Sequence, residues 1–435
     1  MPNVIMLSPF FPPSSYVLGR RNAKLAKHLG AFGWSPTVVA LPEGGRRGYD
    51  AEALARIPPE VVLDWHYAYG LLGTAWWAWD GFKIKRRALQ RPTQAQNQTA
   101  QPDTLSKKLF RLYETYIGTP TTTWGPVDMV LPYVWGAARR AAKLARAHHA
   151  KVIFAACCPY SALLAGVLAG KLTGLPVVLD MRDPWAIEPV YFLKKPAPLQ
   201  RLEAHLEAWC FENAAHIFLN TERSEASYKE RYPQHAQKID VLPNGFDRSV
   251  MQPGEPFVYQ GFSLVHFGNC YATRSLLPAL KAISQERDVR IICFGQILPA
   301  DLEEARRMGL EDKLEVRAPV SYSDAMRALE GASALLLLQP PETDLQIPAK
   351  FYDYLASTRP IIALSANPEI EEILRRTNRG VSADIRDEAQ VEQALRRMIH
   401  GDYSPTQANQ AAVDVYDAAM QAKKVAAVFD RVSRA

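Results

Sequence analysis

The chain has 435 residues, 48% of them hydrophobic and 22% charged, which is long enough for two globular domains. Its five cysteines form no CxxC motif, which argues against a disulfide framework and against a structural metal site. The first residues show no basic leader with a small-residue cleavage site, and no apolar run reaches the roughly 18 residues of a membrane-spanning helix. We therefore expect a soluble, cytoplasmic protein.

The net charge of +6 is unevenly distributed along the chain. Residues 1–248 carry 30 Lys and Arg against 20 Asp and Glu, and residues 83–146 carry 12 against 3. The tryptophans of segment 76–79 precede the basic cluster 83–87, a combination that suits a membrane interface. A helix that packs its tryptophans inward and exposes a basic face explains the same pattern. Nucleic acid is a less suitable partner, because no recognition motif accompanies the basic residues.

The first strand is expected at residues 4–7, and a loop, a helix at 20–29 and a second strand at 37–41 follow it. This βαβ order places the loop at the carboxyl edge of a parallel sheet. The loop contains no GxGxxG motif, so a dinucleotide-dependent dehydrogenase is disfavoured. Gly19, just before the helix N-terminus, still permits the close approach of a phosphate or a sugar.

Strands continue to alternate with helices, which predicts an α/β fold with doubly wound parallel sheets. The pattern restarts at residue 263, after a cluster of Pro and Gly near 248–260 that we interpret as the domain boundary. We predict three parts: an N-terminal domain at 1–248 with an irregular segment at 43–130, a C-terminal domain at 249–412, and a terminal helix at 413–435 that is able to pack back on the first domain. Two such Rossmann-like domains would face each other across a cleft, with the carboxyl edges of both sheets as the expected ligand site.

The stretch 347–364 follows an expected strand at 334–338 and predicts a helix with Pro348 in its first turn. Lys350 and Asp353 lie three residues apart and therefore share one face of this helix. At the mouth of a parallel sheet, the carboxylate would accept hydrogen bonds from ribose hydroxyls and the ammonium would face phosphate. An i,i+3 ion pair on a solvated helix face is the alternative.

Several motifs together resemble the GT-B glycosyltransferases, and specifically the retaining, family-4-type enzymes. They occur in the family's order and cover most of the chain: Phe11-Pro12-Pro13 with Gly19-Arg20, Leu179 to Trp185, Leu242 to Asp247, His266 to Asn269 with Arg274, and Ile347 to Ala356 with Arg359 to Ile362. Each motif is weak by itself, and the combination is fairly specific. The resemblance implies a C-terminal domain that binds a nucleotide sugar and an N-terminal domain that binds the acceptor. It also implies that the nucleotide sugar is a co-substrate, that no further cofactor is needed and that no metal is essential.

The resemblance implies a donor site built from residues of both domains. Gly268 and Asn269 would bring the diphosphate close to the backbone at a helix N-terminus, and Arg274 and Lys350 would neutralise the leaving phosphate. Asp353 would contact ribose hydroxyls, at a position where the family usually has Glu. The other implied donor-binding residues are Gly19, Arg20, Asn244 and Val320. Without the resemblance, Gly268 is an ordinary turn residue and Arg274 a surface cation.

The implied acceptor side includes Tyr160, Ser161 and Arg182, with Asp183 as the candidate acid/base or acceptor-orienting residue. Asp183 is equally well explained as a turn residue. The sequence departs from the family at two further points: Tyr160 replaces a common His, and Leu345 replaces a sugar-contacting Glu. A Tyr at its ordinary pKa is a poor general base, which suits a same-face mechanism in which the leaving phosphate takes the acceptor proton.

The sequence therefore predicts a glycosyltransferase that moves a sugar from a UDP- or GDP-type donor to a glycan, lipid-linked or small-molecule acceptor. The acceptor would be cytosolic or lie at the inner membrane face, with peripheral membrane contact in the second case. Such reactions belong to polysaccharide, glycoconjugate or natural-product biosynthesis. Two alternatives stay open: a GT-B sugar-nucleotide epimerase, which turns over donor without acceptor, and a non-catalytic homologue that binds a nucleotide sugar. Leu345 and Asp353 motivate the second alternative.

Overall fold

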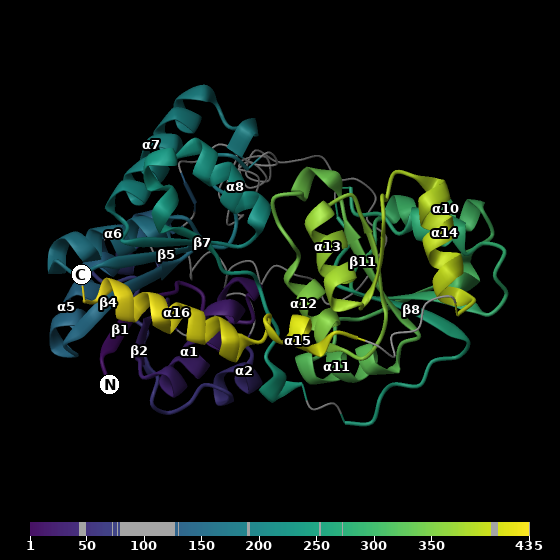
Figure 1. Ribbon diagram of the computed structural model, residues 1–435, viewed down its shortest axis with the longest axis horizontal. Helices are drawn as coiled ribbons and strands as arrows, with labels where there is room; N and C mark the ends of the chain where they lie inside the picture. The colour runs from purple at the N-terminus through teal and green to yellow at the C-terminus, as the bar shows by residue number, and fades with distance from the viewer. Residues whose placement is uncertain are drawn as a thin grey trace. The chain divides into compact units, whose positions relative to one another are not determined.

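The structure is a computed structural model whose described residues are 1–42, 49–71, 73–75, 77–78, 127–128, 130–188, 192–251, 254–271, 273–401 and 408–434. They form two compact units (Figure 1). Unit 1 comprises Met1–Asn220, Ser224–Pro243 and Gln421–Ala435, and unit 2 comprises Thr221–Arg223 and Asn244–Met420. Much of the predicted irregular segment, including the basic cluster 83–87, lies outside the described residues.

Unit 1 is built on a parallel sheet of seven strands in the order β3-β2-β1-β4-β5-β6-β7. The strands are β1 (Asn3–Leu7), β2 (Ser35–Val39), β3 (Val62–Asp64), β4 (Ala150–Ala156), β5 (Val177–Met181), β6 (His216–Leu219) and β7 (Ile239–Val241). The order reverses between β1 and β4, so the loops after these two strands diverge at the carboxyl edge of the sheet. Such a switch point is where open α/β sheets bind their ligands.

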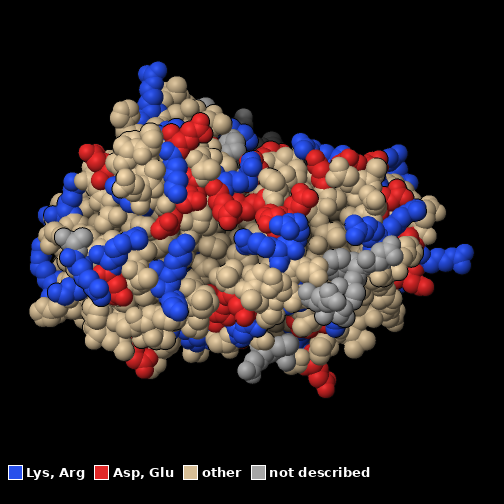
Figure 2. Space-filling view, in the orientation of Figure 1, with Lys and Arg blue, Asp and Glu red and all other residues tan. Residues whose placement is uncertain are grey.

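Side chains alternate between the two faces of this sheet, because successive residues of a strand point to opposite sides. Ile5 and Leu7 face one apolar cluster, which α5 (Val134–Ala147), α6 (Ser161–Thr173) and α7 (Ala197–Asn213) cover. Val4 and Met6 face the other cluster, which α1 (Arg20–Leu29) and the final helix α16 (Ala418–Val432) cover. Unit 1 is therefore a three-layer sandwich that includes the C-terminal end of the chain. Lys and Arg side chains gather on its α5 and α16 end in the face shown in Figure 2.

Unit 2 is built on a parallel sheet of six strands in the order β10-β9-β8-β11-β12-β13. The strands are β8 (Phe262–Phe267), β9 (Val289–Phe294), β10 (Leu314–Arg317), β11 (Ala334–Gln339), β12 (Ile361–Ser365) and β13 (Gly380–Ala383). One face is covered by α11 (Tyr322–Gly331), α12 (Ala349–Ala356) and α13 (Pro368–Thr377), and the other by α9 (Leu277–Ala282), α10 (Pro299–Arg307) and α14 (Glu388–Ile399). The switch point of this sheet lies between β8 and β11.

The predicted terminal helix is broken in the structure into α15 (Gln410–Asp414) and α16. Between them, the Phe246 amide donates to the Tyr416 carbonyl at 3.1 Å, and the Ala418 amide donates to the Phe246 carbonyl at 2.8 Å. These groups pair with a neighbouring strand-like segment and cannot also make helical hydrogen bonds, so the helix is interrupted there. The prediction of one continuous helix from 413 onward was wrong at this point. Among the described residues, no helix is long and apolar enough to cross a membrane.

Substitution of Phe429 on α16 tests the packing of the C-terminal helix against the rest of unit 1. Its ring is fully buried and lies edge-on to Trp34 at 5.2 Å and to Phe154 at 5.8 Å between ring centroids. We expect Phe429→Ala to lower the free energy of unfolding of unit 1 by about 3–5 kcal/mol, because it removes buried apolar surface and leaves a cavity. Urea unfolding followed by tryptophan fluorescence measures this change. Lys423→Ala, at an exposed position of the same helix, should change it by less than about 0.5 kcal/mol. Equal effects of the two substitutions would contradict the packing.

Candidate functional site

The loops after β8 and β11 flank the switch point of unit 2. Thr273 in the first loop donates through its hydroxyl to Glu342 in the second at 3.2 Å, so the two loops are joined across the switch point. Gln339, the last residue of β11, holds the second loop in shape by donating to the carbonyls of Thr343 at 2.7 Å and Gln346 at 2.5 Å. Both loops therefore have defined positions at the edge where a ligand is expected.

Gly268 occupies the turn directly after β8. Its φ of 107° lies in the region that favours glycine, and a Cβ at this position would lie 2.8 Å from Nζ of Lys350. Gly295, after the neighbouring strand β9, has a φ of 151°, and a Cβ there would lie 2.6 Å from the carbonyl oxygen of Gly268. The two glycines thus allow the backbone turn to pack directly under the lysine ammonium.

Lys350 lies in the first turn of α12, the helix predicted from the 347–364 stretch. The ammonium donates to the carbonyl oxygen of Phe267 and lies 3.4 Å from Nε2 of His266. Within the part of the chain that the structure describes, no carboxylate pairs with this ammonium. The alternative interpretation of Lys350 as one half of an i,i+3 ion pair with Asp353 is therefore wrong. Asp353 instead accepts a hydrogen bond from the Tyr322 hydroxyl at 3.0 Å.

The electrostatic surroundings of Lys350 favour the loss of its proton. Burial lowers its pKa to about 8, and the positive charge of Arg274 acts in the same direction, while the thiols of Cys270 and Cys293 act against them. Arg274 is partly exposed, donates to the Tyr271 hydroxyl at 2.7 Å and stacks over the Tyr271 ring at 4.6 Å. Two cations therefore lie at one sheet edge with their charges mutually unfavourable, and a bound anion would relieve this repulsion.

Three further predicted donor residues, Asn269, Asn244 and Val320, belong to unit 2. The Asn269 side chain accepts from the Gln296 amide at 3.0 Å, which fixes the turn after Gly268. The Asn244 side chain donates to the Ile347 carbonyl at 3.4 Å, just before α12. Val320 is 37% exposed in the loop between β10 and α11. Asn269 and Asn244 thus support the loop and helix that carry the cations.

In unit 1, the loops after β1 and β4 flank the other switch point. Gly19 ends the first loop, and a Cβ at this position would lie 2.5 Å from the carbonyl oxygen of Phe10, so the chain requires glycine there. Arg20 is exposed, whereas Arg21 makes two hydrogen bonds of 2.8 Å to the buried Asp180. Arg21 was not among the predicted site residues, because the sequence of two adjacent Arg gives no signal of which one turns inward.

The loop after β5 carries Arg182 and Asp183. Arg182 donates to an Asp183 carboxylate oxygen at 3.1 Å, and the Cys158 thiol donates to the same oxygen at 3.2 Å. The pKa of Cys158 lies well above its ordinary value, because of its neighbouring thiol and its burial, so the thiol stays protonated and remains a donor. Asp183 is partly exposed with its charge offset by these two donors, a geometry that suits orientation of a polar ligand.

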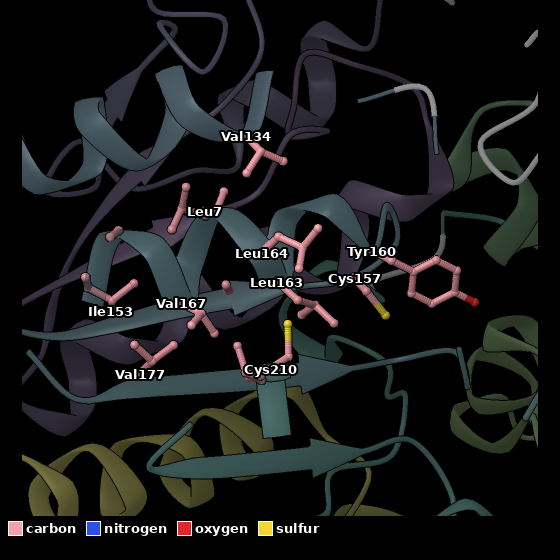
Figure 3. Packing of buried hydrophobic residues seen from close by; sticks show 14 of the residues in the cluster. Leu7, Val134, Ile153, Cys157, Tyr160, Leu163, Leu164, Val167, Val177 and Cys210 are labelled. Carbon is pink, nitrogen blue, oxygen red and sulfur yellow. The ribbon is translucent and has the colours of Figure 1, made fainter. Parts of the chain in front are cut away.

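Tyr160 has a structural environment. Its ring stacks on Trp185 with 5.1 Å between centroids, and its hydroxyl donates to the Pro184 carbonyl at 2.6 Å. Figure 3 shows the ring at one end of the buried cluster, with the hydroxyl directed away from Leu163 and Leu164. Burial raises the pKa of Tyr160 well above 10, so the hydroxyl stays protonated. This side chain supports the 182–185 loop and is not available as a base.

Ser161 is also committed to a buried partner. Its amide and hydroxyl donate to the two carboxylate oxygens of Asp128, at 2.8 Å and 2.6 Å. Burial raises the pKa of Asp128 to about 6, and the hydrogen bonds from Ser161 act against that shift. No sequence motif marked Asp128, because its partner lies 33 residues away along the chain.

Two buried glutamates on α7 also hold the loop 182–186 that follows β5. Glu203 accepts from the Trp185 indole at 3.0 Å and pairs with Lys195 at 2.5 Å. Glu207 accepts from the Ala186 amide at 2.7 Å. The 182–186 loop is therefore fixed at several points. Among the described residues, no group of three or more His, Cys, Asp and Glu is placed to hold a metal ion.

Comparison with known families agrees with this two-unit arrangement. Residues 99–250 match the model "Glycosyltransferase Family 4", and residues 261–401 match the model "Glycosyl transferases group 1". A search of curated protein sequences finds no match to the chain.

Solved structures share the fold over the whole chain. A glycosyltransferase from Rickettsia africae is 11% identical with a TM-score of 0.64, covering 99% of this chain and 98% of its own. The Anabaena protein HepE, in complex with UDP-glucose, is 13% identical with a TM-score of 0.61 and 99% coverage of both chains. A UDP-GlcNAc 2-epimerase from Methanocaldococcus jannaschii is 12% identical with a TM-score of 0.51, covering 99% of this chain and all of its own.

Two parallel-sheet Rossmann-like units, each with its switch point at a carboxyl edge, define the GT-B fold. With both family models matched in this order, the chain belongs to the GT-B glycosyltransferases of the family-4 type. The predicted fold class and enzyme class are thereby confirmed.

Lys350 gives a testable consequence of its lowered pKa. Because the folded-state pKa is about 8 against an ordinary 10.5, the unfolded chain binds more protons between these values. The free energy of unfolding of unit 2 should therefore rise with pH across this window, by on the order of 3 kcal/mol from this group. Urea unfolding at pH 7.5 and pH 10.5 measures the rise, and Lys350→Met should remove that part of it. Lys423→Met, at an exposed position of α16, is the matched control and should leave the rise intact. A wild-type rise that persists in Lys350→Met would contradict the assignment.

Proposed function

We propose that this glycosyltransferase takes a nucleoside-diphosphate sugar as donor, bound by unit 2, and transfers the sugar with retention to an acceptor bound by unit 1. The observation that carries the proposal is the Lys350 ammonium at the switch point, whose partners are a carbonyl and an imidazole rather than a carboxylate. Together with Arg274 and the backbone turn at Gly268, it forms a site suited to a diphosphate. No metal is needed in this scheme, because the two side-chain cations neutralise the leaving phosphate.

The nucleoside would extend along α12 and the loop after β10. The Asp353 carboxylate, one turn beyond Lys350, is oriented by the Tyr322 hydroxyl and would accept hydrogen bonds from ribose hydroxyls. The exposed loop at Val320 would meet the base. The likeness to HepE in complex with UDP-glucose supports UDP as the first candidate nucleotide, and GDP remains the second.

In the reaction, the bond between the sugar C1 and the phosphate oxygen breaks, and a bond from C1 to the acceptor oxygen forms on the same face. The acceptor proton passes to the leaving phosphate oxygen. Tyr160 does not serve as the base, because it is buried and protonated. Gly19 and Arg20 would meet the donor, while Arg182 and Asp183 would orient the acceptor, and Ser161 would act only by holding the adjoining turn.

Donor binding is tested by thermal shift with UDP, GDP, ADP and their sugars. We expect one nucleotide family to stabilise the wild type, by about 2.7 kcal/mol at 100 times its dissociation constant. Asp353→Ala should weaken the binding of the nucleoside diphosphate more strongly than the binding of inorganic pyrophosphate, because only the nucleotide contains a ribose. Glu392→Ala, a carboxylate on α14 that pairs with Arg396, is the control and should leave binding unchanged. If no nucleotide stabilises the wild type, the donor-site proposal is wrong.

Turnover then separates transfer from epimerisation, which the structural likeness to an epimerase keeps as the second candidate. Proton NMR of the bound nucleotide sugar, incubated with and without acceptor, follows both reactions. Product formation that needs an acceptor and keeps the anomeric configuration supports the proposal. A change of sugar configuration at C2 without an acceptor would support the epimerase.

A membrane-bound acceptor is one version of this proposal, and the basic cluster 83–87 that motivates it lies outside the described residues. For a membrane-surface acceptor, we expect the wild type to co-sediment with vesicles that contain anionic lipid. Changing Lys83, Lys85, Arg86 and Arg87 to Glu should abolish this binding, because it reverses the attraction to the anionic surface. If the variant co-sediments as strongly as the wild type, the membrane-surface version is wrong and a soluble acceptor is favoured. Thermal unfolding of the variant controls for misfolding.

A further inference from the structure

His266 is a fully buried polar side chain on β8, the strand that leads into the Gly268 turn. Its Nδ1 lies 2.8 Å from the carbonyl oxygen of Leu336 on the neighbouring strand β11. A carbonyl oxygen only accepts hydrogen bonds, so Nδ1 must carry a proton. In a neutral ring with the proton on Nδ1, the other nitrogen, Nε2, has a free lone pair.

This lone pair faces the Lys350 ammonium, with 3.4 Å between Nε2 and Nζ. A lysine ammonium has three N–H groups and no acceptor. One N–H is directed at the Phe267 carbonyl and a second at the imidazole, which leaves the third for a ligand. The direction of that third N–H is therefore set by two protein acceptors.

We infer that His266 is a positioning residue for the donor diphosphate, acting through its Nε2 lone pair to hold the Lys350 ammonium with one N–H toward the phosphate. This inference rests on the proposed function, because it presupposes that Lys350 binds the donor phosphate. It extends that function to a residue that touches neither donor nor acceptor.

The role requires that the ring stay neutral. Burial and the nearby Lys350 lower the pKa of His266 well below 6.5, with Arg274 acting in the same direction, so the lone pair persists at physiological pH. Among the described residues, the thiols of Cys270 after β8 and Cys293 on β9 also act on the ammonium. The pKa of Cys270 is lowered, chiefly by a hydrogen bond from Cys293, so ionisation of this thiol could mimic a pH effect of Lys350.

Two substitutions separate the two nitrogens of the ring. His266→Asn places an amide donor near Nδ1, where Leu336 needs it, but supplies no acceptor for Lys350. His266→Gln reaches the position of Nε2 with an amide oxygen that can accept from the ammonium. We expect His266→Asn to lower the affinity for the nucleoside diphosphate that stabilises the wild type by about tenfold, in line with loss of a hydrogen bond to a charged group. His266→Gln should lower this affinity by less than about threefold.

The pH profile gives a readout that a purely structural role would not change. In the wild type, the affinity for the diphosphate should fall above about pH 8, as Lys350 loses its proton. In His266→Asn the fall should begin at lower pH, because the ammonium has lost an acceptor, and in His266→Gln it should stay near the wild-type position. Lys350→Arg keeps its charge, so any fall that remains in that variant measures the other groups that titrate in this range, which are Cys270 and the ring N–H of the base itself.

Isothermal titration of the nucleoside diphosphate from pH 6 to 10 supplies these profiles. Identical profiles for Asn and Gln would overturn the inference while leaving the proposed function intact, whereas absence of wild-type binding would overturn the proposed function itself. If both variants fail to fold, ¹⁵N NMR of the wild-type histidines decides the question. A proton on Nδ1 of His266 and a bare Nε2 support the inference, and a proton on Nε2 overturns it.

Discussion

A cation held against a glycine turn is the constraint on which the candidate donor site depends. Lys350 lies so close to Gly268 that a side chain at that turn would meet the ammonium, and Gly295 must yield space to the Gly268 carbonyl in turn. The arrangement costs the ammonium part of its hydration and places it near Arg274, and none of the carboxylates that the structure describes pairs with it. Groups whose pKa is shifted by burial and by a neighbouring charge cluster at functional sites. An anionic ligand bound here would offset the unfavourable free energy of the buried ammonium.

Around the 182–186 loop of unit 1 the situation is the opposite, because the buried acidic side chains that surround it all have partners. Asp180 is held by Arg21, Glu203 by Lys195 and the Trp185 indole, and Glu207 by the Ala186 amide. Such networks fix the geometry of a loop when every member is satisfied. The stacked pair of Tyr160 and Trp185 completes this support. Removing one member of the network would leave a buried charge without its counterpart, which is costly.

The fold could be predicted from the sequence because its signals are local. Short apolar runs typical of buried strands alternate with segments of helical periodicity, and Gly and Pro mark the ends of both. The helix that carries Lys350 was predicted for the same reason. The partners of its side chains could not be predicted, since they come from strands more than eighty residues away, as with His266 and Phe267. The ion-pair alternative for Lys350 and Asp353 was wrong because helical spacing says which residues share a face and nothing of the groups that the tertiary fold brings to them.

If the proposed function is right, the protonation states of the two units indicate which unit supplies which part of the chemistry. Around the switch point of unit 1, Tyr160 and Cys158 remain protonated, and Arg182 pairs with the Asp183 carboxylate. In unit 2, Lys350 and Arg274 present positive charge to the expected diphosphate, while His266 stays neutral beside them. Cations lower the basicity of a phosphate oxygen but stabilise the charge that develops as it leaves. On the proposed mechanism, the leaving phosphate then accepts the proton in the second half of the step, when its charge is greatest. On the proposed function, two cations and a fixed backbone turn in unit 2, with Tyr160 and Cys158 protonated in unit 1, suit this order of events.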